Sequence, residues 1–413
     1  MSHALEKTAL RVGFISLTDC APLAVAKEQG FFAAEGLDVT LCRETSWANI
    51  RDKVMLGALD AAQMPAPMPL AATLGVAGPR VPMITPCVLN LGGNAITVSH
   101  DLFRQMLALA PEALREPPYT ADALRAVIEA RRILDKPPLV FATVFPTSTH
   151  YYQLCYWLSA AGIDPLRDLT LKVISPPHMV RALEMDEIAG FCVGEPWNGL
   201  AVDLGLGVSL ISSYEIWNNA MEKVLAMTEA WHLRHPQTTL ALTRAVVRAC
   251  RWLEKPRHRE LAAILLSRAD YVDVPQQVLE PALMGVRPHR PGEHGIPQPE
   301  FLVFGRSAAN FPWRSQGLWY GEQMRIRGQL PPNVDVSAVV ERSYRPDVFR
   351  EAVAEIDMPV PTIDYKAEGV QHHAWTLQEA TAPIAMGPNA FFTGERFDPV
   401  REAVHQQPAG RVH

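Results

Sequence analysis

The sequence contains no uninterrupted apolar run of about 18 residues, the length that a membrane-spanning helix needs. It also has no run of lysines and arginines, and its 38 basic and 44 acidic residues give a formal net charge of −6. A surface that binds nucleic acid requires a basic face. The sequence therefore predicts neither a membrane protein nor a protein that contacts nucleic acid directly.

Cysteine is scarce, and the six cysteines form no C-x-x-C pair and no spacing typical of metal ligands. Four of them lie inside apolar runs, as buried free thiols do (Cys42, Cys87, Cys155 and Cys192). Residues 1–10 contain no apolar segment of the kind found in secretory signal peptides. Together these features predict a cytoplasmic protein with reduced thiols and no metal site.

The motifs of the common enzyme classes are also missing. There is no G-x-x-x-x-G-K-[ST] phosphate loop, no H-E-x-x-H zinc motif and no G-x-S-x-G nucleophile elbow. Gly205-Leu-Gly207 does not complete a dinucleotide-binding fingerprint. We therefore expect a protein that is not an enzyme and has no cofactor.

What is present is an alternation of strand-like and helix-like segments over a chain of 413 residues, long enough for two lobes. Residues 10–17 and 37–41 read as strands on either side of a helix at 21–29, and the pattern begins again after Ser99. Such alternation favours mainly parallel sheets covered by helices. Residues 228–266 read as helical and residues 275–317 as irregular, and the tail after Asp357 as a wrapping extension.

Residues 139–161 form the stretch around which we arrange the other candidate residues, because it combines a strand, a helix start and a histidine. Leu139 to Val144 is a short run of strand formers between prolines, and helical spacing of apolar residues starts at Tyr151. Small hydroxylated residues at 147–149 lie at the junction, where unpaired backbone N–H groups at a helix start can hold an anion. The alternative interpretation is a helix cap followed by a histidine, His150, that faces solvent.

Polar residues lie at or near the expected strand ends, where open α/β sheets bind ligands. They include Trp47, Asn94, His150 and Lys223, which together offer N–H donors and one cation, as a small oxyanion requires. Each also has a purely structural interpretation: Trp47 as a packed aromatic ring, Asn94 as a turn residue after two glycines, His150 as a histidine beside a helix cap, and Lys223 as a solvated lysine. Spacing alone does not bring them together.

A series of short segments runs in order from about residue 10 to about residue 325: VGFISLTD at 12–19, AKEQGFF at 26–32, ETSW at 44–47, PMP at 67–69, FPTSTH at 145–150, VGEPWN at 193–198 and FPWR at 311–314. In these segments the chain resembles the nitrate/bicarbonate-binding proteins of the NrtA and CmpA type. The resemblance implies an α/β protein with a type II periplasmic-binding-protein fold, in which two lobes enclose a ligand cleft. The implied organisation is lobe I at 1–98, lobe II at 99–223, and a return to lobe I with the wrapping extension at 224–413.

Carried over by position, the resemblance assigns nitrate contacts to Trp47, Asn94, His150 and Lys223, with Pro176 beside the cleft. Family members that bind nitrate are expected to carry a lysine where Lys223 stands, and those that bind bicarbonate an acidic residue. Lys223 therefore indicates nitrate or nitrite. A glutamine is usual where this chain has Asn94, so the shorter amide leaves the affinity and the preference between the two anions open.

Because residues 1–10 show no signal segment, the chain resembles the cytoplasmic NasS-type nitrate/nitrite sensors most. That resemblance implies a partner, an RNA-binding ANTAR-domain antiterminator of the NasT type, which the sensor releases when the anion binds. The alternatives are the substrate-binding component of a nitrate, nitrite or bicarbonate ABC transporter, and an enzyme of cofactor-precursor synthesis on the same fold.

Overall fold

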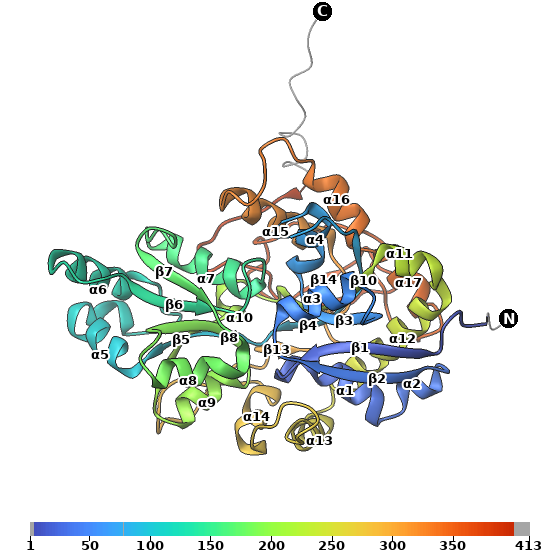
Figure 1. The fold of residues 1–413 in the computed structure, drawn as a ribbon, viewed down its shortest axis with the longest axis horizontal. Coiled ribbons are helices and arrows are strands. Elements are labelled where there is room, and N and C mark those ends of the chain that lie inside the picture. The colour runs from blue at the N-terminus through green and yellow to red at the C-terminus, as the bar shows by residue number, and fades with distance from the viewer. Residues whose placement is uncertain (1–3, 77, 400–413) are drawn as a thin grey trace, which may run out of the picture.

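The chain forms two α/β lobes that lie side by side, each built on its own β-sheet (Figure 1). The computed structural model describes residues 4–76 and 78–399. In Figure 1 the first lobe is on the right, near the N-terminus, and the second is on the left. Within these residues no helix is long and apolar enough to cross a bilayer.

The sheet of the first lobe takes strands from separated parts of the chain: β1 (Ala9–Ile15), β2 (Asp38–Glu44), β3 (Ala61–Pro65), β4 (Met83–Gly92), β10 (Met221–Thr228) and β13 (Leu302–Val303). Their order across the sheet is β13-β4-β10-β3-β1-β2. β1 pairs in parallel with β2 and β3, but β10 pairs antiparallel with β3 and β4, and β13 antiparallel with β4. The prediction of a mainly parallel sheet is therefore wrong for this half, because β4 leaves for the other lobe and β10 returns from it.

The sheet of the second lobe contains β5 (Asn94–Ser99), β6 (Leu139–Thr143), β7 (Leu169–Val173), β8 (Gly190–Gly194) and β9 (Gly207–Ser212). Their order is β7-β6-β8-β5-β9. β6 is parallel to β7 and β8, whereas β5 is antiparallel to β8 and β9. Again the strand that runs antiparallel to its neighbours, β5, is one that connects directly to the other lobe.

Gly92 and Gly93 connect the two sheets, between β4 and β5. Their φ values are +64° and +93°, and a Cβ at Gly92 would lie 2.5 Å from the carbonyl oxygen of Phe301, so glycine is required there. The second lobe thus begins before the predicted boundary between residues 98 and 99, since residues 94–98 pair within the second sheet. Lys223, which the prediction placed at the end of lobe II, lies on β10 in the first sheet.

Helices cover both sheets. Those of the first lobe are the 3-10 helix η1 (Thr18–Cys20), α1 (Ala21–Glu28), α2 (Phe31–Ala34), α3 (Trp47–Met55), α4 (Pro67–Leu74), α11 (Glu229–Arg234), α12 (Pro236–Trp252), α15 (Arg314–Ile326), α16 (Val336–Ser343) and α17 (Pro346–Val353). Those of the second lobe are α5 (His100–Leu109), the 3-10 helix η2 (Pro111–Leu114), α6 (Asp122–Ile133), α7 (Thr149–Ala160), the 3-10 helix η3 (Pro176–His178), α8 (Met179–Glu184), α9 (Trp197–Asp203) and α10 (Ser213–Ile216). α13 (Pro256–Leu266) and α14 (Gln276–Leu283) lie at the lower edge of Figure 1, and α14 packs against both α13 and α9.

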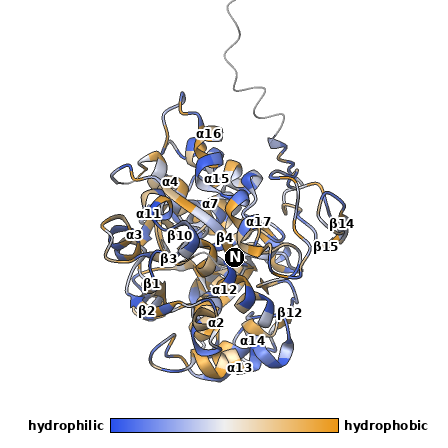
Figure 2. Ribbon diagram, turned by 90° about the vertical axis from the view of Figure 1, so that its right-hand side faces the viewer, coloured by the Kyte–Doolittle hydropathy of each residue, from blue (hydrophilic) through white to orange (hydrophobic). Residues whose placement is uncertain are grey.

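Two parts of the sequence prediction need correction here. The helical segment expected at 228–266 is divided among α11, α12 and α13, because Pro236 and Pro256 each begin a new helix. Residues 275–317, expected to be irregular, contain α14 and a short hairpin of β11 (Val286–Arg287) and β12 (Ile296–Pro297). Figure 2 shows hydrophobic and hydrophilic residues mixed along α13 and α14, as in helices with one buried face.

The segment after Asp357 contains a short hairpin, β14 (Trp375–Leu377) with β15 (Ile384–Met386), and contacts both lobes. On the first lobe, Arg314 forms an ion pair with Asp364 at 2.6 Å. On the second, the Tyr156 hydroxyl of α7 donates to Glu395 at 2.7 Å. The segment from 358 to 399 therefore wraps across the two lobes.

Candidate functional site

The start of α7 follows β6 as the sequence predicts. Ser148 caps the helix: its Oγ accepts the backbone N–H of Tyr151 at 3.1 Å and donates to the carbonyl of Phe145 at 2.8 Å. The prediction of a capped junction is confirmed, but the alternative of a solvent-facing histidine is wrong, because His150 is completely buried. The residue before His150, Thr149, donates a hydrogen bond from its hydroxyl to the carboxylate of Glu222 on the first lobe.

His150 lies in this buried position as a neutral ring. Its Nδ1 is 3.4 Å from the hydroxyl of Thr149, and its Nε2 is 3.7 Å from Oε1 of Glu222. Burial, helped by the positive charge of Lys223, holds the pKa of His150 well below its ordinary value. Among the residues that the structure describes, Nε2 has no hydrogen-bond partner.

Lys223 is a fully buried cation on β10. Neighbouring residues of a regular strand point to opposite faces, but the register of β10 shifts on both sides of Lys223, and its ammonium meets the carboxylate of the preceding Glu222. The Nζ atom is 2.7 Å from Oε1 of Glu222, 2.8 Å from Oδ2 of Asp19, and 5.7 Å from the ring centre of Trp47. Burial alone would lower the pKa of Lys223, but the two carboxylates outweigh it and raise the pKa.

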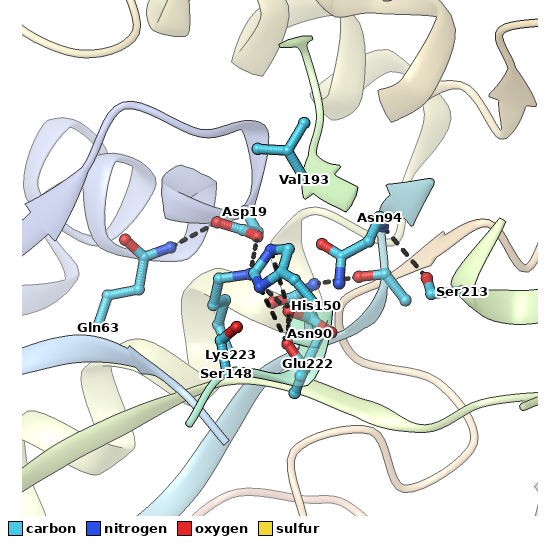
Figure 3. A network of polar contacts seen from close by, with 12 residues as sticks. Asp19, Gln63, Asn90, Asn94, Ser148, His150, Val193, Ser213, Glu222 and Lys223 are labelled. Atoms are coloured by element: carbon cyan, nitrogen blue, oxygen red, sulfur yellow. Dashed lines mark hydrogen bonds and ion pairs between the residues drawn. The ribbon is translucent and has the colours of Figure 1, made fainter. Parts of the chain in front are cut away.

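Asp19 and Glu222 bring two buried negative charges to this one lysine (Figure 3). Asp19 lies just after β1, and its Oδ1 accepts a hydrogen bond from Gln63 Nε2 at 2.6 Å. Gln63 is held in turn by the backbone N–H of Ile15, which donates to its Oε1 at 3.0 Å. Burial raises the pKa of both carboxyls, although Lys223 opposes the rise.

Trp47 enters the site from the first turn of α3. Ser46 caps that helix by accepting the N–H of Asn49 at 3.2 Å, which fixes the position of the indole. The Trp47 side chain is fully buried, and its Nε1 donor has no partner within the described residues. An indole nitrogen can only donate, so this N–H suits an acceptor.

Asn94 enters from the first residue of β5, paired with an unexpected neighbour. Its Nδ2 lies 3.4 Å from Oε1 of Gln153, and its backbone N–H donates to Ser213 Oγ at 3.2 Å. Gln153 lies three residues after His150 on α7 and is buried, and its amide nitrogen has no partner in the described part of the chain. Asn94 is thus shorter than the glutamine that the resemblance leads one to expect, and Gln153 supplies a second amide beside it.

We refer to these residues as the polar cluster: Asp19, Trp47, Asn94, His150, Gln153, Glu222 and Lys223. Its atoms without a hydrogen-bond partner, again within the described residues, are Asp19 Oδ2, Trp47 Nε1, Asn94 Oδ1, His150 Nε2, Gln153 Nε2 and Glu222 Oε2, of which Asp19 Oδ2 still forms an ion pair with Lys223. Leaving one such group buried costs about 1–3 kcal/mol. Several gathered at the junction of two lobes indicate a site for a small polar ligand.

The structure therefore brings together four of the five residues predicted from the sequence: Trp47, Asn94, His150 and Lys223. Pro176 is buried at the start of η3, after the strand that neighbours β6, and its place beside the ligand stays a prediction. The sequence prediction missed Asp19, Gln153 and Glu222. The signals available were the position of Asp19 after the first strand and the i, i+3 spacing of His150 and Gln153 on a helix.

The described residues contain no group of three or more histidine, cysteine or acidic side chains arranged to hold a metal ion. All six cysteines are free, and Cys42 alone among them is not fully buried. The contacts within the polar cluster are ion pairs and hydrogen bonds.

Comparison with known proteins places the chain in a family. Residues 3–267 match the NMT1-like family. The chain is 32% identical over 404 residues to the nitrate/nitrite binding protein NrtA of Synechococcus elongatus, covering 96% of this chain and 85% of NrtA. It is 37% identical over 394 residues to the bicarbonate transport ATP-binding protein CmpC of Synechocystis sp., covering 93% of this chain.

The chain spans about half the length of such ATP-binding relatives: 55% of CmpC, and 52% of the nitrate import ATP-binding protein NrtC of Synechocystis sp.. Among solved structures, the crystal structure of the periplasmic nitrate-binding protein NrtA from Synechocystis PCC 6803 superposes with a TM-score of 0.84 at 27% identity, covering 99% of this chain and 100% of that one. The predicted type II periplasmic-binding-protein fold is confirmed. The chain belongs to the NMT1-like family and, within it, to the nitrate- and bicarbonate-binding proteins of the NrtA type.

Proposed function

We propose that this protein binds a small planar oxyanion of the nitrate class between its two lobes and serves as the substrate-binding component of an ABC import system. The observation that carries the proposal is the completely buried Lys223, surrounded by donors without partners at the junction of the lobes. An ammonium group has three N–H donors, and two of those on Lys223 are taken by Asp19 and Glu222. The third, together with Trp47 and Gln153, can hold the oxygens of a planar anion.

The two lobes touch each other around the polar cluster. The backbone N–H of Thr18 on the first lobe donates to the carbonyl of Glu195 on the second at 2.7 Å, and the indole of Trp197 donates back to the carbonyl of Ser16 at 3.1 Å. With the ligand-facing residues fully buried, an anion enters and leaves only if these contacts open. Binding is therefore expected to favour the closed arrangement by the difference in affinity between the two states.

The import role rests on the relatives, which are a nitrate/nitrite-binding protein and transport proteins for nitrate and bicarbonate. They give no support to the sensor that releases a NasT-type antiterminator, which was the main sequence prediction. That partner, and the cytoplasmic location, stay predictions. Cell fractionation tests the location, and a pull-down from lysate with and without nitrate tests the partner.

The proposal is tested by calorimetric titration of the purified protein with nitrate, nitrite and hydrogencarbonate, with chloride and sulfate as control anions. We expect saturable one-to-one binding of at least one planar oxyanion and a higher melting temperature in its presence. Chloride and sulfate are expected to bind at least tenfold more weakly, because neither matches donors arranged around a plane. Absence of heat and of thermal shift with all three planar oxyanions would contradict the proposal.

A further inference from the structure

We propose that Glu222 links anion binding to the uptake of one proton, so that nitrate is bound together with a protonated Glu222. The inference rests on the proposed function and adds a regulation of the same site. An anion with its own O–H group, such as hydrogencarbonate, would instead donate a hydrogen bond from that group to an ionised Glu222.

The two carboxylates at Lys223 are not equivalent. Both oxygens of Asp19 have a neighbour: Oδ1 accepts a hydrogen bond from Gln63 at 2.6 Å, and Oδ2, which accepts no hydrogen bond from the described residues, forms an ion pair with Lys223 at 2.8 Å. Glu222 concentrates its contacts on one oxygen: Oε1 takes Lys223 at 2.7 Å and the Thr149 hydroxyl, and faces His150 at 3.7 Å. Its Oε2 is buried and accepts no hydrogen bond from the described residues. Glu222 is therefore the carboxylate with an oxygen free to carry a proton.

The charge of the site points the same way. Two carboxylates, one ammonium and a neutral imidazole sum to −1 before any ligand is present. Nitrate would bring the buried total to −2, and uncompensated buried charge costs several kcal/mol. One proton on Glu222 returns the total to −1 and converts Oε2 from an acceptor that repels the anion into a donor that can hold it.

No other group facing Glu222 is better suited to take this proton. His150 on α7 is held neutral by burial and by Lys223, which lower its pKa, and both oxygens of Asp19 on η1 already contact Gln63 or Lys223. Burial raises the pKa of Cys192 on β8 and of Tyr320 on α15, and the negative charge of Glu222 raises both further. The thiol and the phenol therefore already carry their protons. Burial raises the pKa of Glu222 as well, while Lys223, Thr149 and Asn94 oppose the rise.

The direction of the pH dependence follows from linkage. A bound anion raises the pKa of Glu222 further, so the complex holds more protons than the free protein. Nitrate affinity is then highest at low pH and falls by about tenfold per pH unit while Glu222 is ionised in the free protein and protonated in the complex. Hydrogencarbonate, which supplies its own hydrogen-bond donor, is expected to bind with no net proton uptake.

The test is calorimetry of nitrate binding in two buffers of different ionisation enthalpy, at several values between about pH 6 and pH 9. The wild-type protein should take up about one proton per nitrate in the range where affinity depends on pH. Glu222→Gln keeps a neutral donor at this position, so its affinity should be independent of pH with no proton uptake.

Glu195→Gln is the matched control. Glu195 is also a buried carboxyl at the lobe junction, with its pKa raised by burial to about 7, but it lies outside the polar cluster. This variant should retain the nitrate-linked proton. Proton uptake that disappears in Glu195→Gln, or that persists in Glu222→Gln, would overturn the assignment to Glu222.

A second readout does not depend on a variant that binds. Infrared difference spectra of the wild-type protein, with and without nitrate, should gain the C=O stretch of a protonated carboxylic acid. Nitrate binding with no proton uptake and no such band would contradict the inference while leaving the proposed function intact. If neither nitrate, nitrite nor hydrogencarbonate binds at any pH tested, the proposed function itself is wrong.

Discussion

Two groups of charged residues in this protein, one completely and one partly buried, are built in opposite ways. In the Glu254 cluster (Glu254, Arg259 and Arg306), one carboxylate meets two guanidinium groups, at 3.4 Å from Arg259 and 2.9 Å from Arg306. The backbone N–H of Gly305 adds a hydrogen bond at 2.7 Å. Burial would raise the pKa of Glu254, but these partners lower it. The polar cluster has two carboxylates for one cation, and both carboxyls have a raised pKa.

The contrast separates a structural ion pair from a binding site. Arg259 also donates to the backbone carbonyls of Leu283 and Leu302, so the Glu254 cluster connects α13 to α14 and to β13, and its one carboxylate is surrounded by positive charge and N–H donors. The polar cluster leaves donors and two carboxylate oxygens without hydrogen-bond partners, as far as the structure describes the chain. Buried polar groups are normally satisfied, so an unsatisfied group of them needs another explanation, and the proposed anion would supply one.

The largest expected effect comes from Lys223→Met. It leaves Asp19 and Glu222 buried without a cation, which should lower the free energy of unfolding by about 3–5 kcal/mol and abolish nitrate binding. Denaturant unfolding at neutral pH measures the first and calorimetry the second. The combined variant Asp19→Asn, Glu222→Gln, Lys223→Met carries no charge at these positions and should regain stability without binding. A Lys223→Met protein that is stable and binds nitrate normally would contradict the account.

Glu254→Gln should have the opposite profile. It leaves Arg259 with a weaker partner and should lower the free energy of unfolding by about 1–3 kcal/mol. Nitrate affinity should stay within about twofold of the wild type, since the cluster lies outside the binding site. Unfolding and titration on the same preparation measure both. If Glu254→Gln greatly weakened nitrate binding and left the free energy of unfolding unchanged, the Glu254 cluster would not be a purely structural ion pair.

Trp47→Phe is expected to change binding more than folding. It removes a buried N–H that has no partner among the described residues while keeping most of the ring, so the melting temperature should be unchanged or slightly higher. The loss of one donor to the anion should weaken nitrate binding by about tenfold, or about 1.4 kcal/mol. A clear loss of stability with unchanged affinity would show that the indole nitrogen serves the fold.

The smallest effect is on the pH dependence of stability, with opposite signs at the two clusters. The folded-state pKa of Glu222 is raised, so ionised Glu222 lowers the free energy of unfolding at pH values above that pKa. This loss of stability disappears as the pH falls through the folded-state pKa towards the unfolded-state one. The pKa of Glu254 is lowered, so its contribution is present above the unfolded pKa and disappears as pH falls through the folded one. We expect unfolding curves at several pH values to show that Glu222→Gln removes the loss of stability at high pH and Glu254→Gln removes the loss at low pH. If the free energy of unfolding varies with pH in the same way in both variants, this prediction is wrong.

The sequence predicted the parts of the site that depend on local pattern. The run of strand formers at 139–144 and the hydroxylated residues before Tyr151 correctly predicted β6 and the capped start of α7. His150 and Lys223 were identified by resemblance, but their complete burial depends on the second lobe packing over the first, which no local pattern encodes.

The acidic half of the site was missed for a physical reason. Regular strand alternation places Glu222 and Lys223 on opposite faces, and only the register shifts of β10 bring both to the same point. Asp19 reaches Lys223 from a distant part of the chain through the pairing of the first sheet. Long-range pairing also explains the misplaced lobe boundary, since the strand predicted at 95–98 can be assigned to the second lobe only when its partners β8 and β9 are known.

A crystal structure of the protein grown with nitrate tests the central claim most directly. The account predicts the anion in the polar cluster, within hydrogen-bond distance of Trp47 Nε1, Gln153 Nε2 and Lys223 Nζ, with Glu222 Oε2 as the fourth neighbour. Nitrate bound elsewhere on the protein, with the polar cluster unchanged, would contradict it.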